Sequence, residues 1–457
     1  MTSIAEQFVS QVSWQSFSRA KDLHKKIGFT LVALLVYRFG TYIPMPGIDP
    51  NAMKALAQNH GGRGFVSMFN MISGGALERM GVFALNLMPY ISSSIIIQLL
   101  SAVSPYLASL KKEGEVGKHK LTQYTRYGTI ALACIQGGSL ISYLSMSPGV
   151  VYEPGPFFYV SALATVVGST LFLMWLGEQI TSRGIGSGSS MIIYAGIMAN
   201  LPHTIIQSLV KARVDSAFFL VVAAILAAVA LISFIIFMER AYRKVVIEYP
   251  QSRTGNVAYG SEKSYIPLKL NASGVLPSIF ATSIIGFMKM IGQAPWLDFS
   301  SHITNGTVRS IFKGIAHVFA LLLSDQNSLG ILFQMTIIVL FCFFYTSIVF
   351  NTEETADNLR KSGAFIPGCR PGSMTKQYLE TILERITVLG AAYIAFVATF
   401  PAVLNLLFGM DFPFQGTSIL ISVSITIEII SHIHSYVISH QYQPILSSRS
   451  VRRKKRG

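Results

Sequence analysis

Long apolar segments, separated by shorter polar ones, follow each other along most of the chain. Ten near-continuous apolar windows are long enough for a helix to cross the hydrocarbon core of a membrane. They fall at residues 27–43, 80–102, 124–144, 157–176, 190–210, 217–238, 272–291, 332–350, 386–404 and 418–438. A further apolar run at 315–323 is too short to span, and its placement is open. The pattern predicts an all-α polytopic membrane protein with ten transmembrane helices.

The second window follows a short apolar piece. Residues 65–72 form a segment that, as a helix, reaches only about a third of the way across a hydrocarbon core. Gly74 and Gly75 then allow a sharp reversal, because residues without Cβ take backbone angles closed to others. The window itself, residues 80–102, carries no charge but contains an asparagine, a proline, three serines and a glutamine. Such polarity predicts a spanning helix with one side toward protein or water, preceded by a re-entrant element.

The composition agrees with a chain that lies mostly in lipid. Of 457 residues, 51% are hydrophobic and 12% are charged, about half the charge that is typical of soluble domains. Cys134, Cys342 and Cys369 are far apart and form no CxxC pair, so they indicate neither a disulfide framework nor a zinc site. The first 26 residues have no continuous apolar core before their basic residues. They fit an amphipathic helix on the cytosolic surface and not a cleavable signal peptide.

The distribution of Lys and Arg predicts the orientation. If the N-terminus is cytosolic, the cytosolic segments hold 26 of the 36 Lys and Arg residues, and the opposite side holds six. The remaining four lie within or at the ends of the predicted helices. Because basic residues concentrate in cytosolic loops, both termini are predicted to be cytosolic.

Ten helices divide at the loop around Lys211 into two groups of five. An odd number per group means that the second half is inverted if the halves share a fold, as in many transport proteins. The second window contains MPYISSSI and the seventh LPSIFATSI, so each has a proline followed two places later by an isoleucine, Ile91 or Ile279. Chance explains this echo about as well as a shared fold does. The predicted segments are a cytosolic N-terminal segment at 1–26, a first half at 27–210, a second half at 211–441 with cytosolic loops at 240–270 and 353–377, and a basic cytosolic tail at 442–457.

Several long motifs, in order along the chain, resemble the SecY family, whose members are the channel subunit of the bacterial protein translocase. The motifs are MFNMISGGAL, MPYISSSIIIQLL, KKEGE with QYTRYG, FLMWLGEQIT, RGIGSGSSMII and ETADNLRKSGAFIPGCRPG. The resemblance runs from about Ile27 to the tenth window. It implies an hourglass channel of two inverted halves in the bacterial inner (plasma) membrane, with a lateral gate between the second and seventh helices, a plug at residues 64–76 and a constriction ring of aliphatic side chains.

The resemblance also assigns site residues. The implied pore ring is Leu87, Ile91, Ser189, Ile193, Ile279 and Ile421, and the implied plug residues are Phe65, Met68, Phe69, Asn70, Met71, Ile72, Ser73 and Gly74. A narrow aliphatic ring excludes water and therefore ions, while branched side chains deform around a passing polypeptide. Ser189 departs from the aliphatic residue that is usual in the family. Its hydroxyl should weaken the exclusion of water, so either the plug compensates or Ser189 is turned aside.

Four polar residues are assigned to the lateral gate, namely Ser92, Gln98, Asn271 and Thr282. Gln98 lies seven residues from Ile91, and Asn271 lies eight from Ile279. In antiparallel helices both amides are then about 11 Å to the cytosolic side of the ring. This matched depth predicts that they pair across the gate, with a modest bond of about 0.6 to 2 kcal/mol. The alternative is that each amide caps or hydrogen-bonds within its own helix.

The two predicted cytosolic loops are too long and too basic for simple connectors. The bias toward cytosolic positive charge explains their composition without any partner, but it does not explain the rigid sequence FIPGCRPG, where two prolines restrict the backbone. The resemblance implies that these loops dock the ribosome and the motor ATPase SecA. The residues that would do so are Arg243, Lys244, Arg253, Arg360, Lys361 and Arg370. The further partners it implies are SecE-type and SecG-type small subunits, signal sequences, unfolded preproteins and membrane lipids.

The function predicted in this way is a protein-conducting channel, which carries unfolded secretory polypeptides across the membrane and releases hydrophobic segments into it. An enzyme is not expected, because the sequence has no P-loop, and no cofactor is implied. His432 and His434, two residues apart, would point away from one another on a helix, which argues against a shared metal. The alternative function is a secondary transporter of a small solute, for which Glu428 is the candidate ionisable group.

Overall fold

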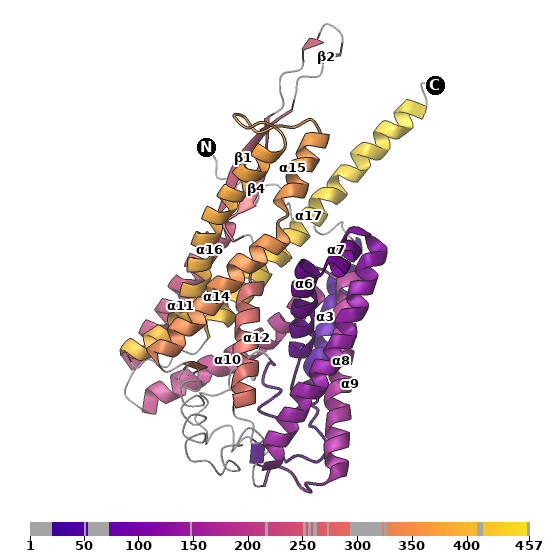
Figure 1. Cartoon of the computed structure of the whole chain (residues 1–457). Helices are drawn as coiled ribbons and strands as arrows, with labels where there is room; N and C mark the ends of the chain where they lie inside the picture. The colour runs from indigo at the N-terminus through magenta and orange to yellow at the C-terminus, as the bar shows by residue number, and fades with distance from the viewer. Residues whose placement is uncertain are drawn as a thin grey trace. The chain divides into compact units, whose positions relative to one another are not determined.

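The computed structural model is mostly helical (Figure 1). It describes residues 21–49, 52–53, 73–146, 149–214, 218–249, 253–254, 257–258, 263–271, 274–292, 322–323, 327–408 and 415–454. The helices at the ten predicted windows are α3 (Lys21–Gly40), α6 (Met88–Val103), α8 (Glu115–Met146), α9 (Pro156–Arg183), α10 (Gly188–Val214), α11 (Phe218–Arg240), α12 (Leu276–Gly292), α14 (Ser328–Val349), α16 (Ser373–Phe408) and α17 (Gly416–Lys454). Every predicted window therefore coincides with a helix. The run at 315–323 lies almost entirely outside the described residues.

Length and hydropathy by themselves select fewer of these helices as membrane spans. Within the described part of the chain, six helices are long and apolar enough to cross a membrane. A seventh is obtained if α6 and the following α7 (Pro105–Lys112), which are bent by 99° at Ser104, are counted as one broken span. The helices at the remaining windows are shorter or more polar, as expected for helices that line protein or water and not only lipid.

The second predicted helix begins later than the sequence indicates. The prediction of a helix from Met80 is wrong, because residues 80–87 are not helical and α6 starts at Met88. Met80 and Asn86 both have left-handed backbone conformations, with φ of 43° and 49°. Such angles cannot continue a right-handed helix, although asparagine tolerates them better than most residues. Hydropathy does not detect this break, since the segment is as apolar as the helix after it.

The described chain divides into two compact units. One consists of Met1–Ser93, Thr125–Leu201 and Ile425–Gly457, and the other of Ser94–Tyr124 and Pro202–Ser424. The two units are defined by contacts between residues, whereas the predicted halves are defined by the orientation of their helices in a membrane. The predicted division into halves at residue 211 therefore stays a prediction.

In the first unit, the core joins α3 to α9 through the segment that precedes α6. The ring of Phe83 stacks on Tyr37 of α3, with centroids 6.1 Å apart, and on Phe172 of α9, at 6.0 Å. The backbone of Gly81 forms a bridge with Pro44, just after α3. This apolar and backbone packing holds the non-helical residues before α6 in place, as the burial of Leu85 and Leu87 shows.

In the second unit, the helices α11, α12, α14 and α16 and the start of α17 share one apolar core, and α14 lies beside α16 (Figure 1). Ile235, Ile338, Ile394 and Leu420 are fully buried in this core. In a membrane the alternative to this burial is contact with equally apolar lipid, so close van der Waals packing holds these helices together. The core thus fixes the start of α12 through Val275, which packs against it.

The loop after α11 is a β-hairpin, which the sequence analysis did not foresee. Strand β1 (Tyr242–Glu248) pairs antiparallel with β4 (Lys263–Lys269), from Tyr242 opposite Lys269 to Glu248 opposite Lys263. A second pair, β2 (Arg253–Thr254) with β3 (Val257–Ala258), lies beyond them (Figure 1). The sequence signal was the β-branched run Val245–Ile247, in which Val245 and Ile247 are buried and Val246 is exposed.

Candidate functional site

Ser73 and Gly74 are the only predicted plug residues that lie within the described part of the chain. The others, residues 65 and 68–72, fall outside it. Gly74 and Gly75 have φ of 68° and 84°, so the prediction that these glycines adopt angles closed to other residues is confirmed. Both Ser73 and Gly74 are buried. The glycine pair therefore sits inside the first unit and not on its surface.

Polar groups of α3 hold the carbonyls at this hinge. The hydroxyl of Tyr37 donates to the Ser73 carbonyl at 3.4 Å, and the Nη1 of Arg38 donates to the Gly74 carbonyl at 2.7 Å. The Asn86 amide in turn donates to the Tyr37 hydroxyl at 3.4 Å. Tyr37 and Arg38 were not among the site residues predicted from the sequence. An arginine inside a predicted membrane helix was the signal that pointed to one of them, since such charges have partners.

Helix α10 approaches the hinge from another side. A Cβ placed on Gly74 would lie 2.9 Å from the Cα of Gly196 and 3.1 Å from its carbonyl oxygen. A Cβ on Gly75 would lie 3.0 Å from the Oδ1 of Asn200. Contacts below 3.0 Å to backbone atoms leave no space for a side chain. Glycine is therefore required at residue 74 both for its φ and for this close approach.

The six predicted ring residues are divided between the two units. Leu87, Ile91, Ser189 and Ile193 belong to the first unit, and Ile279 and Ile421 belong to the second. All five aliphatic members are buried. The hydroxyl of Ser189 lies 3.3 Å from the hydroxyl of Ser187, which gives it a polar partner on its own segment. Their arrangement as a ring stays a prediction.

The predicted gate residues form local hydrogen bonds. The Gln98 amide donates to the Ser94 hydroxyl at 3.3 Å within α6, and the Thr282 hydroxyl contacts carbonyls of its own helix, α12. The Asn271 amide instead donates to a carboxylate oxygen of Glu239 at 2.7 Å. Ser92 is half-buried on α6. The pairing of Gln98 with Asn271 stays a prediction, and in this structure their amide nitrogens donate to other groups.

The two predicted cytosolic loops pack together into one platform, which consists of the β1/β4 hairpin, α15 (Thr352–Lys361), residues 362–372 and the first turns of α16. Glu248 and Phe365 exchange two backbone hydrogen bonds, at 2.9 and 3.0 Å, so the second loop adds a bridge to the hairpin. Beneath them lies a shared core of Val245, Ile247, Leu268, Ala364, Ile366, Leu379, Ile382 and Ile386. A loop pair with its own core is preorganised for binding.

Most of the predicted docking residues are exposed on this platform. Arg243, Lys244, Arg360 and Lys361 are exposed. The Lys244 ammonium lies over the Tyr265 ring, 4.9 Å from its centroid, and Arg360 is 3.6 Å from Asp357 on the same helix. The side chain of Arg253 lies outside the described residues.

An ion pair joins α15 to α16 within the platform. The Lys376 ammonium donates to Glu353 at 2.8 Å. This hydrogen bond, together with the opposite charge of the partner, lowers the pKa of the Glu353 carboxyl and raises the pKa of Lys376. Because the folded pKa of Glu353 is depressed, the stabilisation is present above its unfolded pKa and is lost as the pH falls through its folded pKa. Both groups are exposed to water, so salt screens the pair.

Arg370 occupies a rigid turn of the platform. Gly368 and Gly372 flank it with φ of 84° and 108°, and Pro371 follows it directly. The Thr375 hydroxyl donates to the Arg370 carbonyl at 3.1 Å. The Arg370 side chain is exposed. The backbone is thus fixed while the guanidinium is presented to solvent.

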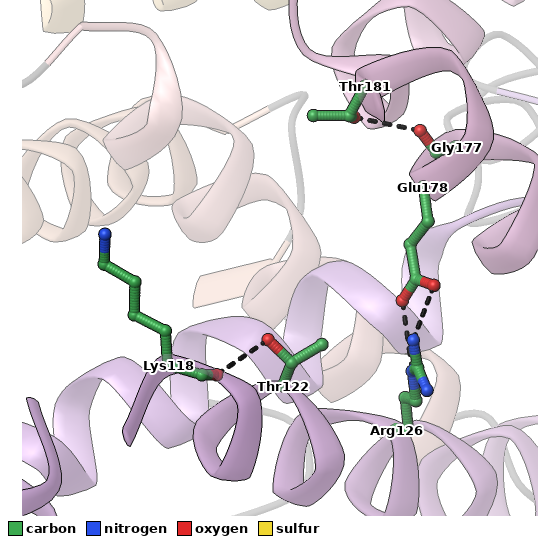
Figure 2. A network of polar contacts seen from close by, with 6 residues as sticks. All are labelled: Lys118, Thr122, Arg126, Gly177, Glu178 and Thr181. Atoms are coloured by element: carbon green, nitrogen blue, oxygen red, sulfur yellow. Dashed lines mark hydrogen bonds and ion pairs between the residues drawn. The ribbon is translucent and has the colours of Figure 1, made fainter. Parts of the chain in front are cut away.

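Arg126 and Glu178 form a pair that the sequence analysis missed, although both stand in motifs quoted above. The Nε and Nη2 of Arg126 on α8 donate to the two carboxylate oxygens of Glu178 on α9, at 3.1 and 2.6 Å (Figure 2). This two-point geometry is the strongest form of an arginine–carboxylate contact. Thr181 lies one helical turn after Gly177, and its hydroxyl donates a hydrogen bond to the Gly177 carbonyl (Figure 2).

Metal-binding geometry is not found among the described residues, where no three His, Cys, Asp or Glu side chains are grouped to hold an ion. His432 instead lies 3.8 Å from Glu428, one helical turn away on α17. Both side chains are about half exposed. Glu428, the residue on which a solute transporter would depend, is therefore not a deeply buried charge.

Comparison with known proteins covers nearly the whole chain. The SecY family profile matches residues 81–430. Protein translocase subunit SecY of Pseudomonas aeruginosa and that of Escherichia coli are each 42% identical to the chain, and the match covers 94% of the chain and 95% of each relative. The protein of the same name from Rickettsia bellii is 43% identical, with 94% of the chain and 98% of the relative covered.

Solved structures show the same fold at low sequence identity. A structure described as that of a protein-conducting channel has a TM-score of 0.58 at 14% identity. One in which the plug domain of the SecY protein stabilises the closed state of the translocation channel has a TM-score of 0.62 at 16% identity. Sec61 in the canine ribosome–channel complex from the endoplasmic reticulum has a TM-score of 0.57 at 15% identity. Each match covers 90% of the chain and 92% of the other chain.

Proposed function

The chain belongs to the SecY family, and from this premise we propose that it carries unfolded secretory polypeptides across a bacterial inner membrane and releases hydrophobic segments through a lateral gate between α6 and α12. The protein is a protein-conducting channel subunit of a translocase. The observation that carries this conclusion is 42 to 43% identity to translocase subunits over at least 94% of the chain. Both termini are cytosolic in this proposal, as the distribution of Lys and Arg predicts.

The seal of the resting channel consists of the aliphatic ring and the plug. The ring residues exclude water because they are apolar, and Ser189 is the weak member. The hinge at Gly74 determines where the plug ends. Tyr37 and Arg38 support this role, because their hydrogen bonds hold the two carbonyls at which the plug joins the rest of the first unit.

The platform is the docking surface of the proposed channel. Its exposed arginines and lysines suit the phosphates of ribosomal RNA and the carboxylates of a motor protein, and its own apolar core keeps them in fixed positions. We assign the ribosome and the ATPase SecA to this surface, and SecE-type and SecG-type subunits to the membrane helices. The channel itself is assigned no catalytic step, so partners or the membrane potential supply the energy.

Reconstitution tests this function against the alternative of a solute carrier. The full chain with its copurifying subunits is placed in proteoliposomes and supplied with SecA, ATP and a radiolabelled preprotein. Protease-protected preprotein that depends on the chain is the expected result. Counterflow of small solutes without any protected preprotein would favour the carrier and contradict the channel.

The proposed orientation predicts one-sided labelling of Cys369, which lies half-buried in the platform. A membrane-impermeant maleimide should label it in inverted vesicles and not in right-side-out vesicles, because the platform is cytosolic. The Cys369→Ser variant identifies the labelled site. Labelling of Cys369 in right-side-out vesicles would show that the orientation is the reverse of the proposed one.

A further inference from the structure

Residues 270–271 form the junction between the cytosolic hairpin and α12, and they are held by contacts on two sides. Strand β4 ends at Lys269, and the next backbone N–H, that of Leu270, donates to the Ala241 carbonyl at 3.0 Å. A Cβ on Gly390 of α16 would lie 2.8 Å from the Leu270 carbonyl oxygen. The chain entering α12 is thus packed between the end of α11 and the face of α16.

A carboxylate at the end of α11 completes this junction. Glu239 accepts a hydrogen bond from the Asn271 amide at 2.7 Å and one from the Tyr393 hydroxyl at 3.4 Å. Asn271 and Tyr393 are buried, with 4% and 3% of their surface exposed. A charge that is partly withdrawn from water is unfavourable unless donors surround it. Two donors from two different elements therefore converge on one carboxylate.

The same side chains belong to the packing of the second unit. Tyr393 lies in the shared apolar core, and its ring meets that of Phe234 edge to face, with centroids 5.8 Å apart. Gly390 and Tyr393 are three residues apart on α16, so both are on one face of that helix. Val275, directly before α12, packs against the same core. A shift of α12 at its cytosolic end would disturb the packing of Val275 and the approach of the Leu270 carbonyl to Gly390.

We propose that Glu239 is a positioning residue that fixes the junction between the cytosolic hairpin and α12, through the Asn271 amide and the Tyr393 hydroxyl. This inference rests on the proposed function, in which α12 is one wall of the lateral gate and the hairpin is part of the docking platform. The carboxylate holds α12 in its resting position and connects it to the surface on which partners bind. Without it, less interaction free energy has to be overcome when a signal sequence displaces α12.

The test compares two preproteins, one with a full-length apolar signal segment and one with a shortened segment, in the proteoliposome assay above. The readout is the ratio of shortened-signal to full-signal transport. Glu239→Ala should raise this ratio about threefold or more, as loss of a hydrogen bond to a charged acceptor predicts. Glu239→Gln retains an oxygen that accepts from Asn271, and its ratio should stay within about twofold of the wild type.

Matched variants separate positioning from general damage. Glu384→Gln removes a carboxylate from an exposed site on α16 and should leave the ratio unchanged. Asn271→Ala removes one of the two hydrogen bonds that Glu239→Ala removes, so it should raise the ratio in the same direction, and the double variant should raise it no further than Glu239→Ala does. Tyr393→Phe, which deletes only one hydroxyl, should shift the ratio in the same direction and is informative if Glu239→Ala does not fold.

Failure of the proposed function and failure of the positioning role of Glu239 give different results. If the folded wild-type complex transports neither preprotein, the proposed function is contradicted. If it transports both and the ratios of Glu239→Ala and Tyr393→Phe equal that of Glu384→Gln, the positioning role of Glu239 is contradicted while the function stands. Equal loss of transport for both preproteins in Glu239→Ala, without rescue by Gln, would also contradict it.

Discussion

Arg370→Glu is expected to lower SecA-driven transport about a hundredfold, since reversing a charge that meets a complementary partner costs several kcal/mol and each 1.4 kcal/mol is tenfold. The turn around Arg370 is fixed by two left-handed glycines and by the Thr375 hydrogen bond, while its side chain is exposed. Such a preorganised arginine offers two-point binding to a carboxylate or phosphate. Arg370→Lys, which retains the charge and loses this geometry, should lower transport about tenfold.

The measurement is ATP-dependent transport into proteoliposomes at matched density of the complex. Arg183→Glu makes the same charge change at an exposed residue at the end of α9 and serves as the control. Its transport should match the wild type, because the many remaining basic residues still set the orientation. Transport by Arg370→Glu at the level of Arg183→Glu would show that Arg370 contributes only general positive charge.

Gly74→Val is expected to raise the resting ion conductance of the channel about tenfold. A β-branched residue at φ of 68° is strained by about 1 to 2 kcal/mol, and its Cβ would lie 2.9 Å from the Cα of Gly196. The hinge would then leave its position against α10. The plug, which ends at this hinge, would no longer seal the channel. A change of 1.4 kcal/mol in the closing equilibrium corresponds to the tenfold rise.

Single-channel recording in planar bilayers measures this conductance. Gly149→Val is the matched control, because Gly149 also has a left-handed φ, of 82°, but its Cβ would meet nothing within 4 Å. Arg38→Met is a second variant, which removes the donor to the Gly74 carbonyl without touching the backbone and should also raise the conductance. Wild-type conductance in both Gly74→Val and Arg38→Met would show that the hinge does not contribute to the seal.

The sequence by itself determined the helices, the left-handed hinge and the family. In lipid the backbone must satisfy its own hydrogen bonds, so an apolar segment of sufficient length becomes a helix whatever its neighbours are. That is why all ten windows coincide with helices. The glycine pair at residues 74 and 75 was equally readable, because only glycine takes such angles without strain. The family followed from long motifs.

Only the tertiary structure decided which polar groups meet. The sequence indicated neither the hydrogen bond from the Asn271 amide to Glu239 nor the pair of Arg126 with Glu178. The late start of α6 at Met88 depends on two left-handed residues in a segment of uniform hydropathy. A hydrogen-bond partner is set by which side chains are brought within about 3 Å of each other across tens of residues. Local composition is enough to decide that a segment forms a membrane helix. It contains no information on which distant side chains come within hydrogen-bonding distance.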